Sequence, residues 1–511
     1  MTRRNQINIR ELGYTYRYFR DLCPSYLKFA ASIAGFRFSL APLSYLELGF
    51  GQGVSINIHA AACDGVFWGS DYNPAQVAFA QSLATASGAR VELLADSFEQ
   101  LARRDDLPTF NMITLHGIWT WISESDRAHI IELVRRKLAP GGLLYVSHNS
   151  LTGWAKMLPL RKLMFAHAQM AGGPDEPLTT KVRHAIEFVQ SLHDVGAKHA
   201  QTNPGAVAQL QALRAKSDTY LAHEFFSDNW TPTAFLDVVA QFGEADLSFV
   251  GTTHLMDTLE GFSMPQPAQR LLESISDPVL REATREYLID ATFRKDVFIK
   301  TPERLSAREQ DEALLDTQFV LAAGIDETPM QARNSTGAVN LDPGHFRPIL
   351  EALAANDHAP KSLRELAKAG VLRGEDVRQM AGEVIALLSG PVVFVVGNRA
   401  PSELLHAQCS ALNRRICELA IYDGGELRDV ASPVVGGGVP VGESEQLFLL
   451  GYLQGAADPA SCAAFAWKCV ATRVRAERGD IAGDDAISRL TEHARAFMSG
   501  RLPILKALGV I

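Results

Sequence analysis

A glycine-rich loop with an acid ahead of it is the part of the chain best suited to chemistry. Gly49, Gly51 and Gly53 follow an apolar run and come directly before a stretch with helical periodicity. Glycine at these positions lets the backbone turn sharply and approach a ligand where a side chain would block it. A dinucleotide fingerprint needs its third glycine at position 54, where this chain has Val54. Glu47, two residues before the loop, instead favours a cofactor with an amino-acid ammonium group and no phosphate.

Two further acids follow the next two apolar runs. Asp71 stands 22 residues after Gly49 (71 − 49 = 22), close to the offset of about 20 residues at which a carboxylate meets ribose hydroxyls. Asp96 can accept a hydrogen bond from an adenine amino group, with Phe98 packed on the ring. One such acid alone is more often a helix cap or a surface charge, but three at successive strand ends favour a ribose-adenine cofactor. The predicted cofactor contacts are Tyr16, Tyr18, Glu47, Gly49, Gly51, Gly53, Asp71, Tyr72, Asp96, Ser97, Phe98 and His116.

The elements that position these residues alternate between strands and helices. This alternation predicts a parallel sheet covered on both faces, with ligands bound at the carboxyl ends of the strands. The expected strands are 43–48, 66–70, 91–94, 111–115 and 143–148, and the expected helices are 54–63, 74–87, 97–104 and 125–138.

The rest of the chain divides by its periodicity. We expect a Rossmann-like α/β domain over residues 1–260, interrupted by a helical insertion at about 153–218 and closed by two more strands, 220–226 and 245–253, around a helix at 233–242. The pattern of residues 261–340 predicts a helical middle domain. That of residues 341–511 predicts a mainly helical carboxy-terminal domain, which begins with a winged-helix-like order of three helices and a strand.

Composition and charge exclude several classes of protein. The chain has 511 residues, 47% of them hydrophobic and 21% charged, which is typical of two to four globular domains. A net charge of −9 argues against a nucleic-acid partner. There is no secretory signal and no apolar run near the roughly 18–20 residues of a membrane span, so we expect a cytoplasmic protein. Six scattered cysteines without a Cys-x-x-Cys pair predict reduced thiols, and we expect no metal site.

Over residues 43–150 the sequence resembles the class I S-adenosylmethionine-dependent methyltransferases. The resemblance rests on the Glu47 loop, Asp71, Asp96, the segment 110–121 and the sequence Leu-Ala-Pro-Gly-Gly at 138–142. It implies S-adenosylmethionine as cofactor, S-adenosylhomocysteine as product and the α/β fold of that class.

Four sequence segments resemble those of a narrower group, the bacterial methyltransferases that carry a methyltransferase regulatory domain. This group is best known as outer-membrane-protein lysine methyltransferases. The segments are residues 14–24, 116–123, 148–154 and 223–226. The resemblance implies a catalytic, a middle and a carboxy-terminal domain, homodimers, and methylation of lysine side chains. The chain departs from the group at 148–152, where His148 and Leu-Thr replace an expected aromatic residue and a proline-containing turn.

The segment after the fourth strand is expected to meet the acceptor. It lacks the Pro-Pro-aromatic and Pro-Cys motifs of DNA methyltransferases. Trp119 and Trp121 either line an apolar channel that desolvates an amine or pack in the core, and His116 is interpreted as a cofactor contact or satisfied polar group more than as a general base. His148 and Asn149 are candidates for orienting the reacting groups. The predicted catalytic residues are thus Trp119, Trp121, His148 and Asn149.

Three other functions stay open. The chain could methylate a small molecule or sugar, or bind the cofactor as a non-catalytic regulatory or assembly protein. A DNA-binding role for the winged-helix-like unit is disfavoured, because residues 360–399 carry six basic and four acidic side chains, too small an excess for a phosphate-binding face.

Overall fold

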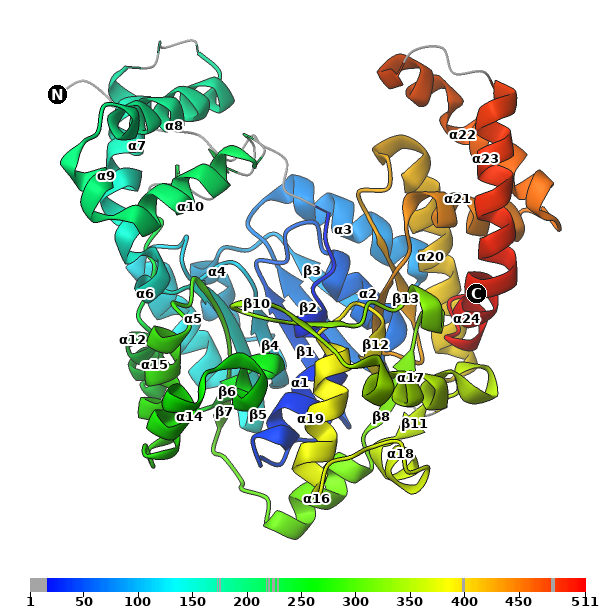
Figure 1. The fold of residues 1–511 in the computed structure, drawn as a ribbon, viewed down its shortest axis with the longest axis horizontal. Coiled ribbons are helices and arrows are strands. Elements are labelled where there is room, and N and C mark those ends of the chain that lie inside the picture. Colours follow the sequence, from blue (N-terminus) through cyan, green and yellow to red (C-terminus); the bar gives the residue numbers. More distant parts are fainter. Residues whose placement is uncertain are drawn as a thin grey trace.

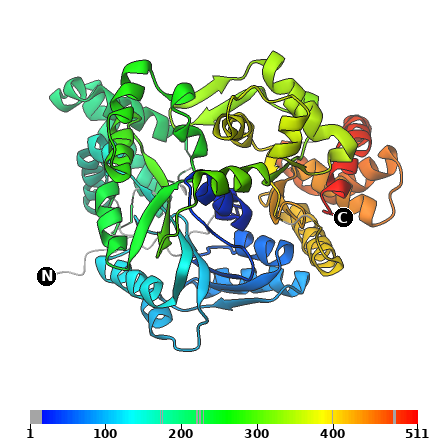
Figure 2. The same ribbon diagram turned by 90° about the horizontal axis from the view of Figure 1, so that it is seen from below.

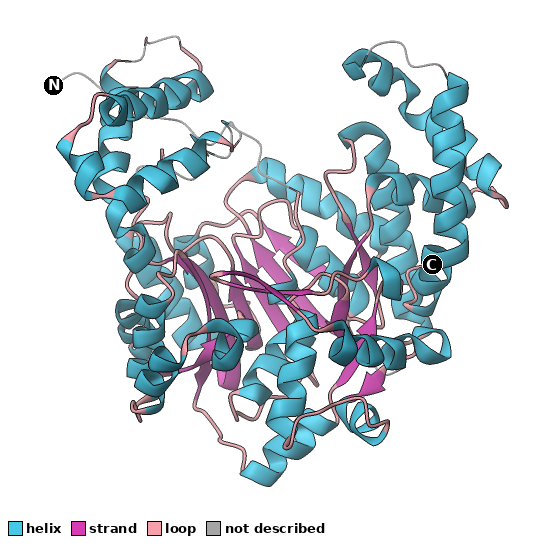
Figure 3. Ribbon diagram, in the orientation of Figure 1, coloured by secondary structure: helices cyan, strands magenta, loops and turns pink. Residues whose placement is uncertain are grey.

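A seven-stranded sheet forms the centre of the molecule, with helices on both faces (Figure 1 and Figure 3). The computed structural model describes residues 16–171, 173, 176–216, 218, 221–222, 226–227, 229–397, 400–478 and 483–511. The strand order in the sheet is β3-β2-β1-β4-β5-β7-β6. The strands are β1 Leu43–Leu48, β2 Gly65–Ser70, β3 Val91–Leu94, β4 Phe110–Leu115, β5 Leu138–Asn149, β6 Leu247–Thr252 and β7 Phe293–Lys300.

The first five strands are parallel, as the sequence predicts, while β7 runs antiparallel to both of its neighbours, β5 and β6. All four predicted helices between these strands are present: α2 Val54–Ala62, α3 Pro74–Ser87, α4 Phe98–Arg103 and α5 Glu124–Lys137. The carboxyl ends of β1 to β5 therefore meet at one edge of the sheet, which carries the glycine loop and the three predicted acids.

Both faces of the sheet are buried, so the strands read as nearly continuous apolar runs. Tyr45 on β1 belongs to the core beneath α2, α3 and the amino-terminal helix α1 (Pro24–Ile33). Leu46, one residue later, belongs to the core beneath α4, α5 and α12 (Phe235–Gly243). Because successive side chains of a strand point to opposite faces, Glu47 lies on the α1–α2 face together with Tyr45.

The strand β7 corrects the prediction for the end of the sheet. The sequence pattern placed the sixth strand at 220–226, but Leu221 and Ala222 are helical, and most of that segment lies outside the described residues. The strand between β5 and β6 comes instead from residues assigned to a helical middle domain. Its sequence, Phe-Arg-Lys-Asp-Val-Phe-Ile-Lys, looks exposed because it carries four charges. Two of those charges are buried and paired, Arg294 with Asp296 at 2.7 Å, so the strand can lie inside the sheet.

The helical insertion forms a separate small layer above β5 (Figure 1). Its helices share a core of their own, built from residues such as Met164, Val182, Val189 and Leu210. The insertion agrees with the predicted span of 153–218. Its helices are α6 Leu151–Trp154, α7 Leu158–Met170, α8 Leu178–Asp194, α9 Lys198–Thr202 and α10 Pro204–Arg214.

Residues 261–340 contain strands as well as the predicted helices. Helices lead from β6 to β7 and beyond: α13 Glu260–Ser263, α14 Gln266–Glu273, α15 Pro278–Leu288 and α16 Ala307–Leu315. Strands follow within 261–340, namely β8 Gln318–Leu321 and the hairpin of β9 Gln331–Asn334 and β10 Gly337–Asn340. Helices still make up more of 261–340 than strands do, as the sequence predicts, but the pattern did not reveal these strands.

The winged-helix-like order is present, with a sheet that the sequence did not reveal. Three helices pack on a three-stranded sheet in which β8 is the central strand. The prediction missed β8 because it lies before the first helix of the unit. The elements are α17 Pro343–His358, β11 Lys361–Ser362, α18 Leu363–Lys368, α19 Val377–Leu388 and β12 Val393–Val395.

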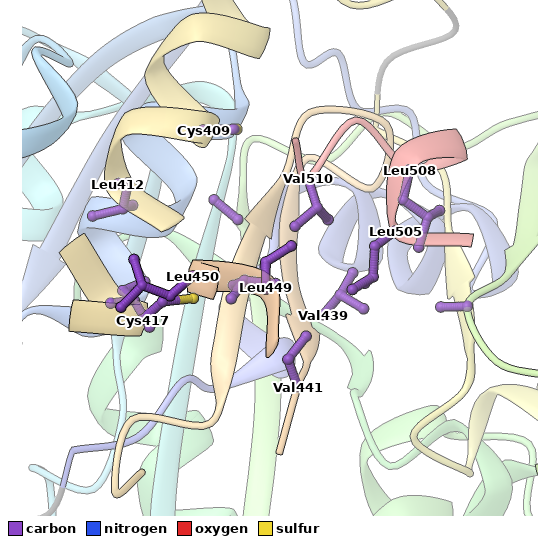
Figure 4. Close-up of a cluster of buried hydrophobic side chains, with 14 of the residues drawn as sticks. Cys409, Leu412, Cys417, Val439, Val441, Leu449, Leu450, Leu505, Leu508 and Val510 are labelled. Atoms are coloured by element: carbon purple, nitrogen blue, oxygen red, sulfur yellow. The ribbon is translucent and has the colours of Figure 1, made fainter. Parts of the chain in front are cut away.

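The last hundred residues pack against the central sheet's own helices (Figure 2). Helix α20 contacts α2 and α3, and side chains from both regions, such as Ile58 and Leu412, share one apolar core. Figure 4 shows side chains from α20, β14, α21 and α24 converging in this core. The elements are α20 Glu403–Asp423, β13 Asp429–Ser432, β14 Gly437–Pro440, α21 Glu443–Leu453, α22 Pro459–Arg478, α23 Gly483–Ala496 and α24 Leu502–Ala507.

Replacing the central charge of β7 tests whether its buried pairing holds the sheet together. Asp296 is fully buried and contacts Arg294 and His148. Asp296→Asn keeps the shape but leaves Glu282, at 2.9 Å, as the remaining ionic partner of the buried Arg294 guanidinium, and breaking a buried pair costs up to about 3–5 kcal/mol. We expect a clearly lower urea midpoint by circular dichroism. The control Glu303→Gln, which breaks an exposed pair with Arg37, should cost about 1 kcal/mol or less. Equal effects would contradict this role of Asp296.

Candidate active site

The glycine loop after β1 is shaped so that side chains are excluded from it. Gly49, Gly51 and Gly53 have φ values of 65°, 60° and 68°, in the left-handed region that favours glycine. A Cβ on Gly49 would lie 2.4 Å from Cδ1 of Ile118, and a Cβ on Gly53 would lie 2.4 Å from Cβ of Ala80. The loop therefore passes close to its neighbours and exposes backbone, which suits an extended cofactor lying across the ends of the strands.

Asp71 links the glycine loop to the end of β2. Its Oδ2 accepts a hydrogen bond from the Gly51 amide at 2.9 Å, and its Oδ1 accepts one from the Asn73 amide at 2.9 Å. The side chain is buried, and burial raises its pKa above the ordinary value. Asp71 thus lies where the sequence placed a ribose-binding carboxylate, with its two oxygens held by backbone amides.

The residues after β3 are brought together, but two of them have local partners. Asp96 is half-buried and forms an ion pair with Arg104 at 2.9 Å. The Ser97 hydroxyl caps α4 by accepting from the Gln100 amide. Phe98 packs at the edge of the core below. These positions border the predicted adenine site, and Ser97 serves as a helix cap. Tyr72, after β2, is 55% exposed.

Glu47 is a buried carboxylate without a cation beside it. It is 4% exposed, and the Tyr45 hydroxyl donates to its Oε2 at 3.1 Å. Burial raises the pKa of Glu47 to about 8. Among the residues that the structure describes, no Lys or Arg forms an ion pair with it. A buried acid of this kind favours a ligand that brings its own positive charge, so the residues present fit the cationic amino-acid end of the predicted cofactor.

The tip of β4 carries an aromatic cluster, which we define as Phe19, His116, Tyr145 and Phe293. The His116 ring lies 4.0 Å from the Phe19 ring and 5.8 Å from the Phe293 ring, between centroids. His116 Nδ1 is hydrogen-bonded to the Tyr145 hydroxyl at 2.8 Å. Burial lowers the pKa of His116 to about 3, so its imidazole is neutral at physiological pH.

An ion pair lies next to the aromatic cluster and carries no net charge. Lys295 on β7 contacts Asp21 at 2.7 Å, and the Thr253 hydroxyl donates to the same carboxylate at 2.9 Å. Burial alone would raise the pKa of Asp21, but the Lys295 ammonium and the nearby imidazoles outweigh it and hold the pKa below its ordinary value. The Asp21 carboxylate is therefore ionised near neutral pH.

Five residues of this cluster and ion pair are not among the site residues predicted from the sequence: Phe19, Asp21, Tyr145, Phe293 and Lys295. Tyr145 could have been found from the alternation along β5, because it shares a face with Ser147 and Asn149. No local signal connects Asp21 with Lys295, which are 274 positions apart.

Two predicted catalytic residues lie elsewhere. Trp119 is fully buried in the core on the opposite face of the sheet, with its ring 4.7 Å from that of Phe242. His148 is also fully buried and contacts Asp296. Trp119 lies in the turn after β4 and follows the core alternative that the sequence left open, while His148 is the last residue but one of β5. Neither side chain is exposed toward the predicted acceptor site.

The other two predicted catalytic residues keep that candidacy. Trp121 is half-buried in the turn after β4, where its amide donates to the carbonyl of Ile118. Asn149 ends β5 on the same face as Ser147 and is 4% exposed. Its side-chain Nδ2 is buried without a hydrogen-bond partner, a situation that favours a donor awaiting a ligand.

The two predicted tyrosines of the amino-terminal segment do not behave alike. Tyr16 packs edge-on against Phe79 of α3, with ring centroids 5.0 Å apart. Tyr18 is 7% exposed and lies beneath the hairpin of β13 and β14, with its hydroxyl 3.2 Å from Nε2 of His59. Tyr18 is therefore not a direct cofactor contact, and Phe19, the next residue, faces the site. Residues 14 and 15 of the same motif, like residues 223–225, lie outside the described residues.

Within the described ranges, no three side chains of His, Cys, Asp or Glu lie together as they would around a metal ion. In the same ranges no helix has the length and apolar character needed to cross a bilayer.

Two family descriptions match the chain. Residues 46–142 match a methyltransferase domain, which covers the glycine loop, Asp71, Asp96 and His116. Residues 217–300 match a predicted methyltransferase regulatory domain, which includes β6 and β7.

Relatives of nearly the same length exist. An uncharacterized protein, sll1526, from Synechocystis sp. is 29% identical over 99% of both chains. The structure of PKMT2 from Rickettsia typhi in complex with AdoHcy aligns with a TM-score of 0.70 at 17% identity, covering 98% of this chain and all of that one. A second structure of PKMT2 aligns with a TM-score of 0.69. This likeness extends the shared fold over the carboxy-terminal half.

Glu47→Gln should make the free protein more stable and weaken its cofactor binding. An acid whose folded pKa is raised loses stability as the pH rises above its unfolded pKa. The shift from an ordinary 4.5 to about 8 corresponds to up to about 3 kcal/mol at pH 7. Gln still accepts from the Tyr45 hydroxyl and removes this cost, so the melting temperature should rise near pH 7 and change little near pH 4.5.

The same substitution removes the charge expected to meet the cofactor's ammonium group. Calorimetric titration with S-adenosylmethionine should show binding that tightens between pH 6 and pH 7.5, as Glu47 ionises, up to about tenfold per pH unit. This dependence should disappear in Glu47→Gln. Unchanged affinity and unchanged pH dependence in the variant would refute the assignment of Glu47.

Proposed function

We propose, from the premise that this chain is an S-adenosylmethionine-dependent methyltransferase with a methyltransferase regulatory domain, that it methylates the ε-amino group of lysine side chains in a protein. The observation that carries the proposal is the neutral aromatic cluster at the tip of β4. His116 is uncharged there, and the Phe19 and Phe293 rings both pack against it. Such a site accepts an alkyl amine and strips its water.

The chemistry requires the amine to lose its proton before attack. Free lysine has a pKa of about 10.4, and a desolvated site lowers it by disfavouring the charged form. The adjacent Asp21–Lys295 pair is internally neutral, so it neither attracts a second ammonium strongly nor repels the neutral amine. The cofactor supplies an electrophilic methyl group on a sulfonium. The chain's own contribution is then orientation and exclusion of water.

His116 and Asn149 are proposed to orient the amine. A base with a pKa of about 3 cannot hold a proton near pH 7, so His116 serves as a hydrogen-bond partner and not as a general base. The buried, unpartnered Nδ2 of Asn149 is a donor on the same face of the sheet. The amine proton leaves to solvent before the transfer.

The likeness to PKMT2 supports this choice of acceptor. Its alignment covers both chains almost completely, including the helical insertion and the carboxy-terminal half. Homodimer formation and a cytoplasmic location stay predictions from the sequence. A small-molecule or sugar acceptor is the second candidate, and a non-catalytic cofactor-binding role is the third.

Transfer of labelled methyl groups decides among these acceptors. The full chain is incubated with methyl-labelled S-adenosylmethionine and fractionated bacterial lysate, with Asp71→Ala as the control that lacks the proposed ribose carboxylate. We expect label in protein fractions, recovered as ε-N-methyl-lysine after acid hydrolysis. Label found only in low-mass products would replace the lysine proposal with the small-molecule one. Cofactor binding with no labelled product in any fraction would favour the non-catalytic role.

The pH profile separates orientation from base catalysis at His116. Because the pKa of His116 is about 3, its titration contributes nothing to the activity limb between pH 6 and pH 9, which should reflect the acceptor amine. His116→Gln should lower kcat by up to about a hundredfold, as expected for the loss of an orienting contact, and leave the shape of the profile unchanged. Loss of the limb in the variant would instead identify His116 as the base.

A further inference from the structure

The segment 16–23 has two opposite faces, each engaged with a different part of the molecule. Phe19 and Asp21 face the site, where Phe19 contacts His116 and Asp21 contacts Lys295. Arg20 and Cys23 face the carboxy-terminal half. Arg20 donates to the carbonyl of Gly390 at 2.8 Å, and Cys23 donates to the carbonyl of Gly436 at 3.4 Å. The segment is thus held between the site and residues from the other end of the chain.

The hairpin of β13 and β14 is fitted to the Tyr18 ring. A Cβ on Gly437 would lie 2.5 Å from the Tyr18 hydroxyl oxygen, and a Cβ on Gly438 would lie 2.7 Å from the ring carbon Cδ1. Both glycines have ordinary backbone conformations, since neither has a positive φ. Glycine is needed here for the close approach of Tyr18 and not for the turn.

A series of buried contacts connects Tyr18 with Glu47, the carboxylate predicted to bind the cofactor. The Tyr18 hydroxyl is 3.2 Å from Nε2 of His59 on α2. The His59 ring meets the Tyr45 ring edge-on, with centroids 5.6 Å apart. The Tyr45 hydroxyl donates to Glu47. All four side chains are buried, so a displacement of Tyr18 has no empty space to absorb it.

We propose that Tyr18 is a positioning residue through which the carboxy-terminal hairpin at Gly437 and Gly438 holds Phe19, Asp21 and Glu47 in place for cofactor binding and methyl transfer. On this proposal the carboxy-terminal half helps to position the residues of the site. The proposal is independent of whether the acceptor is lysine, because its test measures cofactor binding.

The two glycines permit a matched test, because they contact different atoms of the same ring. A Cβ at Gly437 meets the Tyr18 hydroxyl oxygen most closely, at 2.5 Å, with Cys23 Sγ next at 3.0 Å, whereas a Cβ at Gly438 meets only ring carbons of Tyr18. Tyr18→Phe removes only the hydroxyl. It should therefore relieve the first collision and leave the second unchanged.

Each glycine variant is made in the full-length chain with Tyr18 and with Phe at that position, and S-adenosylmethionine binding is measured by calorimetry below the melting temperature. Because the added methyl group overpacks against Tyr18, Gly437→Ala should raise Kd about tenfold with Tyr18 present. Relative to Tyr18→Phe alone, adding Gly437→Ala should then raise Kd by less than about threefold. Gly438→Ala should raise Kd similarly in both backgrounds.

Two outcomes would overturn the proposal. One is a folded Gly437→Ala protein with unchanged Kd, which would make the contact purely structural. The other is an equal rise of Kd for Gly437→Ala in both backgrounds, which would exclude Tyr18 as the connection.

If Gly437→Ala fails to fold, Tyr18→Leu tests the same connection by removing the ring without adding atoms. It should raise Kd for S-adenosylmethionine about tenfold and increase amide hydrogen exchange at residues 19–22. An unchanged Kd and unchanged exchange would overturn the proposal.

Discussion

The pairing of charges on β7 is the interaction on which both the sheet and the site depend. This strand lies between β5 and β6, where both of its faces are covered. Arg294 and Asp296 neutralise each other on one face, and Lys295 meets Asp21 on the other. Burial of an unpaired charge costs far more than the strand's apolar residues return. The same pairs that allow β7 into the sheet therefore also hold the amino-terminal segment over the tip of β4.

The two halves of the chain are joined by packing that no single half provides. One apolar core contains side chains of α2 and α3 together with those of α20, β14 and α21. Three polar contacts around Gly436 reinforce the junction, since Cys23 and Cys63 both donate to its carbonyl and Ser25 donates to that of Val435. A carboxy-terminal half attached in this way moves with the catalytic sheet.

Each end of the site has a buried titratable side chain that is mostly uncharged near pH 7 in the free protein. At the acceptor end, burial keeps the His116 imidazole uncharged. At the cofactor end, burial keeps the Glu47 carboxyl largely protonated near pH 7 until a cation arrives. Near pH 7 the raised pKa of Glu47 costs stability in the free protein, and a cationic ligand offsets this cost, whereas the lowered pKa of His116 costs stability only as the pH falls below 6.5. The surroundings of these two groups are held in place by other contacts. Asp21 is ion-paired with Lys295, and the Asp71 carboxylate accepts hydrogen bonds from backbone amides.

The amino-acid sequence by itself determined the first five strands, the helices between them, the glycine loop and the acids Glu47, Asp71 and Asp96 at the strand ends. These features depend on apolar periodicity and on turn residues, which act within about ten neighbouring positions. Only the tertiary structure decided which side chains face the site. It moved Trp119 and His148 into the core, placed Tyr18 under a hairpin more than four hundred residues away, and brought Phe19, Asp21 and Lys295 to the tip of β4. The physical reason is that the direction of a side chain at a strand end, and the partner of a buried charge, are set by contacts between segments that the local pattern does not connect.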